Sequence, residues 1–248
     1  MKIAIYGDSF AEGSPQTKHF HWYNILGRLY NAQVTCYGRA GSSTFHSYKT
    51  LLEKYREYDL NILLVTHYGR YTRHLTFTMT GPKRFYVPSL RTASMMKTEL
   101  DSQLLDSEKE MLSHLENHFI VQDDEFLKTA QDCLIRNLLA TVPNIIVLPC
   151  FQEDFSMLNT LKQQLNLGAS PSCWEFLGAQ RKYFGITDQT QNNYIERQEA
   201  IACHFTEETN EVYAQSVYDY IMNKKPISAP DIIAHRFNRD YYYEYTTI

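Results

Sequence analysis

Long hydrophobic runs and an excess of positive charge are both missing from this sequence. Lys2 is followed by only four apolar residues before polar residues begin, which is too short for a signal peptide or a membrane span. The formal net charge is −4, so the chain has no general attraction to nucleic-acid phosphates or anionic lipids. We therefore expect a protein that stays in the cytoplasm, without a nucleic-acid partner and without membrane insertion.

Paired cysteines are also missing, since none of the five has the C-x-x-C spacing of zinc or redox sites. An odd number of dispersed cysteines suits a reducing compartment, and we expect each to be a buried thiol that packs as a small hydrophobe: Cys36, Cys133, Cys150, Cys173 and Cys203. His19 and His21 have no neighbouring carboxylate or cysteine that would complete a metal site, so we expect them at the surface or at the rim of a substrate site.

Tyrosine, in contrast, is abundant, with 19 residues in a chain of 248. Several gather in the C-terminal tail at 228–248, which contains Tyr241, Tyr242, Tyr243 and Tyr245. Tyrosine is enriched at protein interfaces because its ring is apolar and its hydroxyl is polar. The tail therefore suggests a contact in a homo-oligomer or a larger assembly.

Four short apolar runs predict β-strands at 2–6, 33–37, 61–66 and 144–149. Each run is continuous, as expected of strands that are covered on both faces. Helical spacing of apolar residues separates them, and alternating strands and helices imply a parallel sheet with right-handed crossovers. We predict an α/β fold, a three-layer α/β/α sandwich with a flavodoxin-like parallel sheet, in the strand order 2-1-3-4 with a fifth strand left open.

The length of the chain favours a single domain over residues 1–248. Residues 75–120 interrupt the strand and helix rhythm with a turn at Gly81 and Pro82 and a charged helix, and we interpret them as an insertion or a lid. A helix at 124–140 leads into the fourth strand. After Phe151 the pattern weakens until a final helix, which Thr206 can cap.

The first predicted strand ends in Gly7, Asp8 and Ser9. Open parallel sheets bind their ligands at the carboxyl edge of the strands, so a serine there can meet a substrate. Gly7 permits a tight exit from the strand, and a helix that starts nearby directs backbone N–H groups at an anion. Ser9 is therefore either a nucleophile or only the cap of the following helix.

His204 favours the first interpretation, because a serine hydroxyl is a weak nucleophile without a base that accepts its proton. It stands directly before the capped final helix, and the fold can return this junction to the edge where the first strand ends. A strand-end serine and a histidine at a loop-to-helix junction together predict a Ser-His pair.

These blocks resemble those of the SGNH, or GDSL-type, hydrolase superfamily of esterases, lipases, thioesterases and carbohydrate deacetylases. Gly7-Asp8-Ser9 matches its first block, Gly41 fits the glycine of its second block, and His204-Phe205-Thr206 with Asn210 resembles its last. The resemblance implies that Ser9 is the nucleophile, His204 is the base, and the N–H groups of Ser9 and Gly41 form the oxyanion hole. It further implies a small-molecule or glycan ester as substrate, with no metal and no organic cofactor.

The chain departs from this family at two positions. The third block normally supplies an asparagine after strand three, but none follows Thr66 here, so either Thr66, His67 or Arg70 replaces it or the hole keeps two donors. Ile201 stands where the family has an aspartate, which leaves a Ser-His dyad or an orienting role for Glu199; Asp8 is a further residue that orients the site or contacts substrate. The alternative is a weak or inactive protein of this fold, with a structural or binding role in an assembly such as a phage particle.

Overall fold

Four parallel strands form the central sheet of the protein. The structure is a computed structural model and describes residues 1–12, 20–39, 42–68, 74–77, 83–86, 105–120, 124–150, 171–183 and 205–223. The strands are β1 (Lys2–Tyr6), β2 (Gln33–Cys36), β3 (Leu60–Val65) and β6 (Ile145–Pro149), in the order β2-β1-β3-β6. The predicted order is confirmed, and every strand end lies within one residue of its predicted position.

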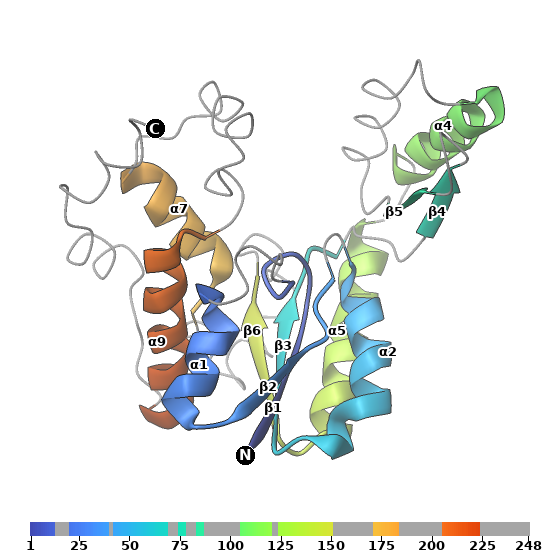
Figure 1. The fold of residues 1–248 in the computed structure, drawn as a ribbon. Helices are drawn as coiled ribbons and strands as arrows, with labels where there is room; N and C mark the ends of the chain where they lie inside the picture. The colour runs from blue at the N-terminus through green and yellow to red at the C-terminus, as the bar shows by residue number, and fades with distance from the viewer. Residues whose placement is uncertain are drawn as a thin grey trace.

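Helices cover both faces of this sheet, as Figure 1 shows. One face carries α1 (Trp22–Tyr30), α7 (Cys173–Tyr183) and α9 (Glu207–Asn223), and the other carries α2 (Thr44–Lys54) and α5 (Asp124–Thr141). Successive strand residues point to opposite faces, so Ile3 and Ile5 enter one core cluster and Ala4 and Tyr6 enter the other. The predicted three-layer α/β/α sandwich is confirmed.

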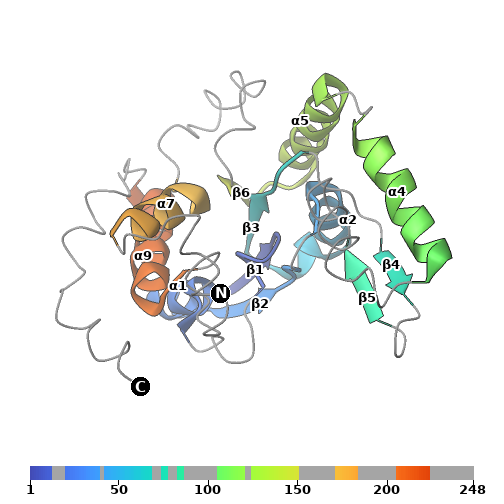
Figure 2. The same ribbon diagram turned by 90° about the horizontal axis from the view of Figure 1, so that it is seen from above.

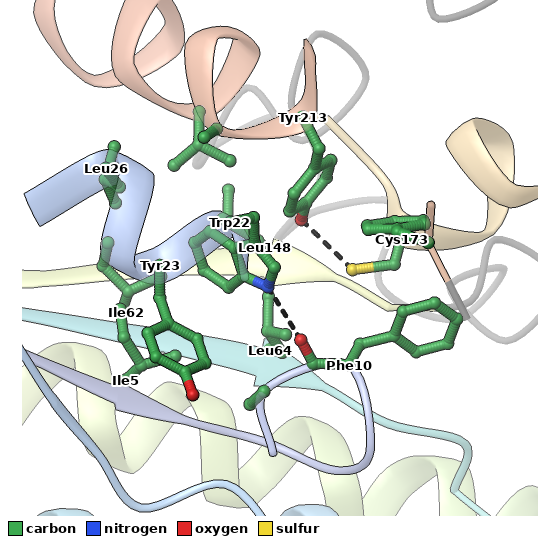
Figure 3. Close-up of a cluster of buried hydrophobic side chains, with 14 of the residues drawn as sticks. Ile5, Phe10, Trp22, Tyr23, Leu26, Ile62, Leu64, Leu148, Cys173 and Tyr213 are labelled. Atoms are coloured by element: carbon green, nitrogen blue, oxygen red, sulfur yellow. Dashed lines mark hydrogen bonds between the residues drawn. The ribbon is translucent and has the colours of Figure 1, made fainter. Parts of the chain in front are cut away.

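The core on the α1 and α9 face is built around aromatic rings (Figure 3). The ring of Tyr213 lies edge-on to those of Trp22 and Phe176, with centroids 5.2 and 5.1 Å apart. All three side chains are fully buried. The Tyr213 hydroxyl accepts a hydrogen bond from Cys173 Sγ at 3.2 Å, and burial raises the pKa of this phenol well above its usual value. The cluster ties α7 and α9 to the sheet through α1.

A hairpin and a helix follow β3 in the region predicted as an insertion or lid. The hairpin pairs β4 (His74–Phe77) with antiparallel β5 (Lys83–Tyr86), in a sheet separate from the central one. The helix α4 (Asp106–Ile120) confirms the expected charged helix. In Figures 1 and 2 these elements lie on the α2 and α5 side of the sheet. Whether this region acts as a lid stays a prediction.

Three sequence expectations differ from the structure. The helix α7 was not foreseen, because its buried face includes the polar Gln180, whose side-chain oxygen accepts a hydrogen bond from the Thr206 amide at 3.0 Å. His21 is buried rather than at the surface, with its ring centroid 4.4 Å from that of Tyr23. A place at the rim of a substrate site stays a prediction. Cys133 is exposed on α5 and Cys36 is half-buried, whereas Cys150 and Cys173 are buried as expected. His19 and Cys203 lie outside the described residues.

Across the described part of the chain, no helix combines the length and apolar character needed to cross a membrane.

Two leucines of α1 provide a test of this core. Leu26 is fully buried in the core cluster on the α1 and α9 face of the sheet, whereas Leu29 is 38% exposed on the same helix. Replacing Leu26 with Ala should lower the free energy of unfolding by about 2–5 kcal/mol, because it leaves a cavity. Replacing Leu29 with Ala should change it by less than about 1 kcal/mol. Urea denaturation followed by circular dichroism measures both, and equal losses would contradict the packing described here.

Candidate active site

A single helical turn directly follows β1 and presents Ser9. The Asp8 carbonyl accepts hydrogen bonds from the amides of Ala11 and Glu12 at 3.0 and 2.9 Å. The Asp8 carboxylate Oδ1 accepts another from the Phe10 amide at 3.0 Å. Asp8 is fully buried, so its side chain holds the turn from within the protein.

Ser9 is half-buried in this turn. Within the described ranges, neither its amide nor its hydroxyl has a hydrogen-bond partner. A serine that caps a helix accepts a bond from an amide two or three residues further on, but here the capping oxygen belongs to Asp8. Among the described residues, Ser9 therefore does not act as the cap of this turn.

Gly7 is required by the close approach of this turn to β3. A Cβ atom at position 7 would lie 2.8 Å from the Cβ of Leu64 and 3.2 Å from that of Ala11. Real Cβ atoms do not approach another carbon to 2.8 Å without displacing it. The glycine thus allows Ser9 to sit close above the carboxyl edge of the sheet.

The loop after β2 is fixed to the loop after β1. The Gly7 carbonyl accepts hydrogen bonds from the Arg39 amide at 3.0 Å and from the Ser42 hydroxyl at 2.9 Å. A Cβ atom on Gly38 would lie 2.6 Å from the carbonyl carbon of Ala11, so the two backbones are in direct contact. Gly41 lies outside the described residues, but it stands in sequence between Arg39 and Ser42.

A thiol adds to this contact between the two loops. Cys36 Sγ donates to the Ala11 carbonyl at 2.6 Å and accepts from the Gly38 amide at 3.2 Å. Burial raises the pKa of Cys36 to about 11, so the thiol keeps the proton that it donates. Cys36 ends β2, where its small side chain donates to the loop after β1 and accepts from the loop after β2.

The loop after β3 joins the same network through Thr66, which is 2% exposed. Its amide donates to Thr44 Oγ1 at 3.2 Å, and its hydroxyl donates to the Ser42 carbonyl at 3.4 Å. The proton of this hydroxyl is therefore already engaged. His67 is half-buried, and its ring stacks on Tyr68 with centroids 4.5 Å apart. Arg70 lies outside the described residues.

The last sequence block reaches the same edge through the residue that follows His204. Phe205 is buried, and its ring centroid lies 5.2 Å from that of Phe10, the residue that follows Ser9. The next residue, Thr206, caps α9 as predicted, since its Oγ1 accepts from the Thr209 amide at 3.2 Å. His204 and Glu199 themselves lie outside the described residues.

Cys150 also belongs to this region, although its sequence context predicted only a buried thiol. The thiol stands directly after β6, is fully buried, and donates to Asp8 Oδ1 at 3.6 Å. Its carbonyl accepts from the Trp174 amide in the first turn of α7 at 2.9 Å. Its position in the sequence could have indicated this role, because Cys150 follows the fourth predicted strand and therefore lies at the same edge of the sheet as Ser9.

The carboxyl edge thus gathers the ends of β1, β2, β3 and β6 around Ser9, whose hydroxyl and amide have no hydrogen-bond partner among the described residues. Among the described residues, no group of three histidine, cysteine or acidic side chains is arranged to hold a metal ion. A serine with a free hydroxyl and a free N–H can attack a carbonyl carbon and bind the oxygen that becomes negative. No side chain in the described ranges is hydrogen-bonded to the Ser9 hydroxyl.

Comparison with known proteins finds likeness in structure but not in sequence. No family model and no curated protein sequence matches the chain. A lipolytic protein of the G-D-S-L family from Veillonella parvula is similar over 90% of this chain and 99% of its own, with 13% identity and a TM-score of 0.38. The acetyl xylan esterase AlAXEase is similar over 90% and 100%, with 12% identity and a TM-score of 0.41.

Two glycines provide a matched test of the contact between the loops. Gly38 to Ala should destabilise the protein by about 1–3 kcal/mol, because its methyl group would overlap the backbone at Ala11 and Glu12. Gly178 to Ala should stabilise it by about 1 kcal/mol, because Gly178 lies within α7 with nothing near its Cβ position. Thermal unfolding of both variants measures the difference. Similar shifts in the two variants would contradict the close packing at Gly38.

Proposed function

We propose that the protein is a serine hydrolase that cleaves an ester-type bond of a small-molecule or glycan ester in the cytoplasm, with Ser9 as nucleophile and His204 as base. The observation that carries the proposal is the state of Ser9. It is half-buried at the carboxyl edge of the sheet, in a turn held by Asp8, and its hydroxyl and amide have no partner among the described residues. A serine that only capped this turn would accept a hydrogen bond from one of its backbone amides.

The pairing with His204 is supported by its neighbour in the chain. Phe205 packs against Phe10 with ring centroids 5.2 Å apart, and each ring belongs to the residue after one of the two proposed catalytic groups. The contact joins the described residues that follow the two proposed catalytic groups, which supports their pairing. In the proposed mechanism, the histidine block of the sequence supplies the base.

The oxyanion hole is supported by the N–H of Ser9, which has no partner in the described part of the chain, and by the bonds that flank Gly41. Arg39 and Ser42 both bond the carbonyl of Gly7, two residues before Ser9. Thr66, His67 and Arg70 are the candidates for a third donor. The Thr66 hydroxyl already donates to the Ser42 carbonyl and would have to give up this bond. The remaining candidates are therefore His67 and Arg70. If the hole instead keeps two donors, the loss of one donor typically costs about 10²–10³ in rate, and we then expect a slow enzyme.

The proposed reaction proceeds in two halves. The Ser9 oxygen attacks the ester carbonyl as His204 accepts its proton, and the hole binds the oxyanion. The C–O bond to the alcohol breaks, the alcohol takes the proton from His204, and the acyl group stays on Ser9. Water then attacks this acyl-enzyme with His204 again as base, which releases the acid and restores Ser9. An orienting group such as Glu199 would hold the histidine ring.

The alternative of a non-catalytic assembly component draws on the tail at 228–248, which lies outside the described residues. It differs from the proposal in one measurable property, the reactivity of Ser9. A fluorophosphonate reacts with a serine only when a base and an oxyanion site activate it.

The first test compares Ser9→Ala with Ser107→Ala. The wild-type protein should react with a fluorophosphonate at Ser9 and hydrolyse a short-chain aryl ester, because both need an activated serine. Ser9→Ala should lose both activities, and Ser107→Ala, which changes an exposed serine of α4, should keep them. Mass spectrometry of the labelled peptide identifies the site. A folded wild type that is neither labelled nor active would overturn the proposal.

The second test compares His204→Gln with His114→Gln. Loss of the base should slow labelling of Ser9 by about 10²–10⁴-fold, the usual contribution of general base catalysis. His114 is an exposed histidine of α4 with 76% of its side chain accessible, and its replacement should leave the rate unchanged. Stopped-time labelling at pH 7 gives both rates. An undiminished rate in His204→Gln would remove the histidine from the mechanism.

A further inference from the structure

Two buried side chains, those of Trp22 and Asn210, connect the residue after Ser9 to the residue after His204. Trp22 is the first residue of α1 and is fully buried, and Asn210 lies in the first turn of α9 and is 2% exposed. The two residues are 188 positions apart in the sequence. Neither was predicted to have a role in positioning the site.

The first half of the connection joins α1 to the serine turn. The indole Nε1–H of Trp22 donates to the Phe10 carbonyl at 2.7 Å, as the dashed line in Figure 3 shows. Phe10 directly follows Ser9, and its own amide is held by Asp8. The backbone beside Ser9 is thus bonded on one side to Asp8 and on the other to Trp22.

The second half joins α1 to the segment that leads from His204 into α9. Asn210 Oδ1 accepts from the backbone amide of Trp22 at 2.8 Å. Asn210 Nδ2 donates to the carbonyls of Phe205 and Thr206 at 3.3 and 2.9 Å. An amide side chain has two donors and one acceptor oxygen, so this one asparagine satisfies three backbone groups at once.

The capping chemistry of α1 depends on this arrangement. The first amides of a helix have no partner within the helix, and the side chain of His21, at the N-cap position, makes no capping bond. Asn210 supplies the acceptor from another helix. Loss of the Asn210 side chain would leave buried backbone groups unbonded on both α1 and the segment before α9, at the cost of an unsatisfied buried group for each.

Packed rings fill the space around these bonds. The ring centroid of Phe205 lies 5.2 Å from that of Phe10 and 5.1 Å from that of Tyr213, and Tyr213 in turn packs edge-on to Trp22. Closely packed interiors resist displacement of one segment relative to another. The hydrogen bonds therefore fix the register of the two segments, and the rings fix their separation.

We infer that Trp22 and Asn210 are positioning residues, which set the distance between the Ser9 turn and the His204 segment through the chain of bonds from Phe10 to Phe205. The inference rests on the proposed function, because it assigns the link a role in catalysis rather than in stability alone. A displacement of about 1 Å between reacting groups can cost about 10²-fold in rate. The link would act on the reaction of the bound molecule and leave its binding almost unchanged.

The test uses two variants that weaken different bonds of the link. Asn210→Asp keeps an oxygen for the Trp22 amide but replaces the donor to Phe205 and Thr206 with a second oxygen, which repels their carbonyls. Trp22→Phe keeps an aromatic ring and removes the donor to Phe10. If one variant fails to fold, the other still tests the link. Tyr213→Phe is the matched control, because it removes a buried hydroxyl of α9 that bonds Cys173 and leaves the link intact.

Fluorophosphonate labelling at several probe concentrations separates binding from reaction. Both link variants should lower the maximal labelling rate about 10–100-fold, with the half-saturating probe concentration within about twofold of wild type. The pH at which labelling is half-maximal should also shift in Asn210→Asp, because the histidine segment moves. Tyr213→Phe should lower the melting temperature without lowering the maximal rate. Equal rates in wild type and link variants, or an equal loss in Tyr213→Phe, would overturn the inference.

The outcome also distinguishes this inference from the proposed function. A wild type that is labelled at Ser9, with undiminished labelling in Asn210→Asp and Trp22→Phe, contradicts the positioning role alone. A folded wild type that is not labelled at all contradicts the proposed function, and the positioning role with it.

Discussion

The hydrogen bond from the Phe10 amide to the buried Asp8 carboxylate is the interaction on which the rest of the site depends. It gives the turn after β1 a cap that is not Ser9. A serine in this position would otherwise satisfy its own turn, as serines at helix starts commonly do. With Asp8 in that role, the Ser9 hydroxyl and N–H remain unbonded among the described residues. The same carboxylate oxygen accepts the thiol of Cys150, which ties the turn to the end of β6.

The backbone carbonyls of Gly7 and Phe10, on either side of Ser9, connect this turn to neighbouring segments by hydrogen bonds. The carbonyl of Gly7 holds Arg39 and Ser42 of the loop after β2. The carbonyl of Phe10 holds the indole of Trp22, and through it the side chain of Asn210. Segments from four distant parts of the sequence therefore meet at one edge of the sheet. The arrangement explains how a site can be assembled from residues near both ends of the chain.

Much of the fold could be predicted from the sequence because buried parallel strands leave a local signal. The runs at 2–6, 33–37, 61–66 and 144–149 are continuous and apolar, and their alternation with helices implies a parallel sheet. The helix α7 could not be predicted, since its buried Gln180 is recognisable only once the Thr206 amide is seen beside it. The burial of His21 likewise depends on tertiary packing and has no mark in the local pattern.

The candidate site was only partly accessible to the same reasoning. The strand-end position of Ser9 follows from local pattern, whereas the capping role of Asp8 and the roles of Trp22 and Asn210 depend on contacts between distant segments. The positions of Gly41, Arg70, Glu199 and His204 stay predictions, because these residues lie outside the described part of the chain.

The central claim is that Ser9 and His204 act as nucleophile and base of one site at the carboxyl edge of the sheet. A crystal structure of the protein after reaction with a fluorophosphonate tests it most directly. The account predicts a phosphonyl group on the Ser9 oxygen, with its free oxygen about 2.7–3.1 Å from the Ser9 amide nitrogen and a nitrogen of His204 about 2.6–3.2 Å from the Ser9 oxygen. An imidazole that lies on the opposite face of the sheet, or a phosphonyl group on another residue, would contradict it.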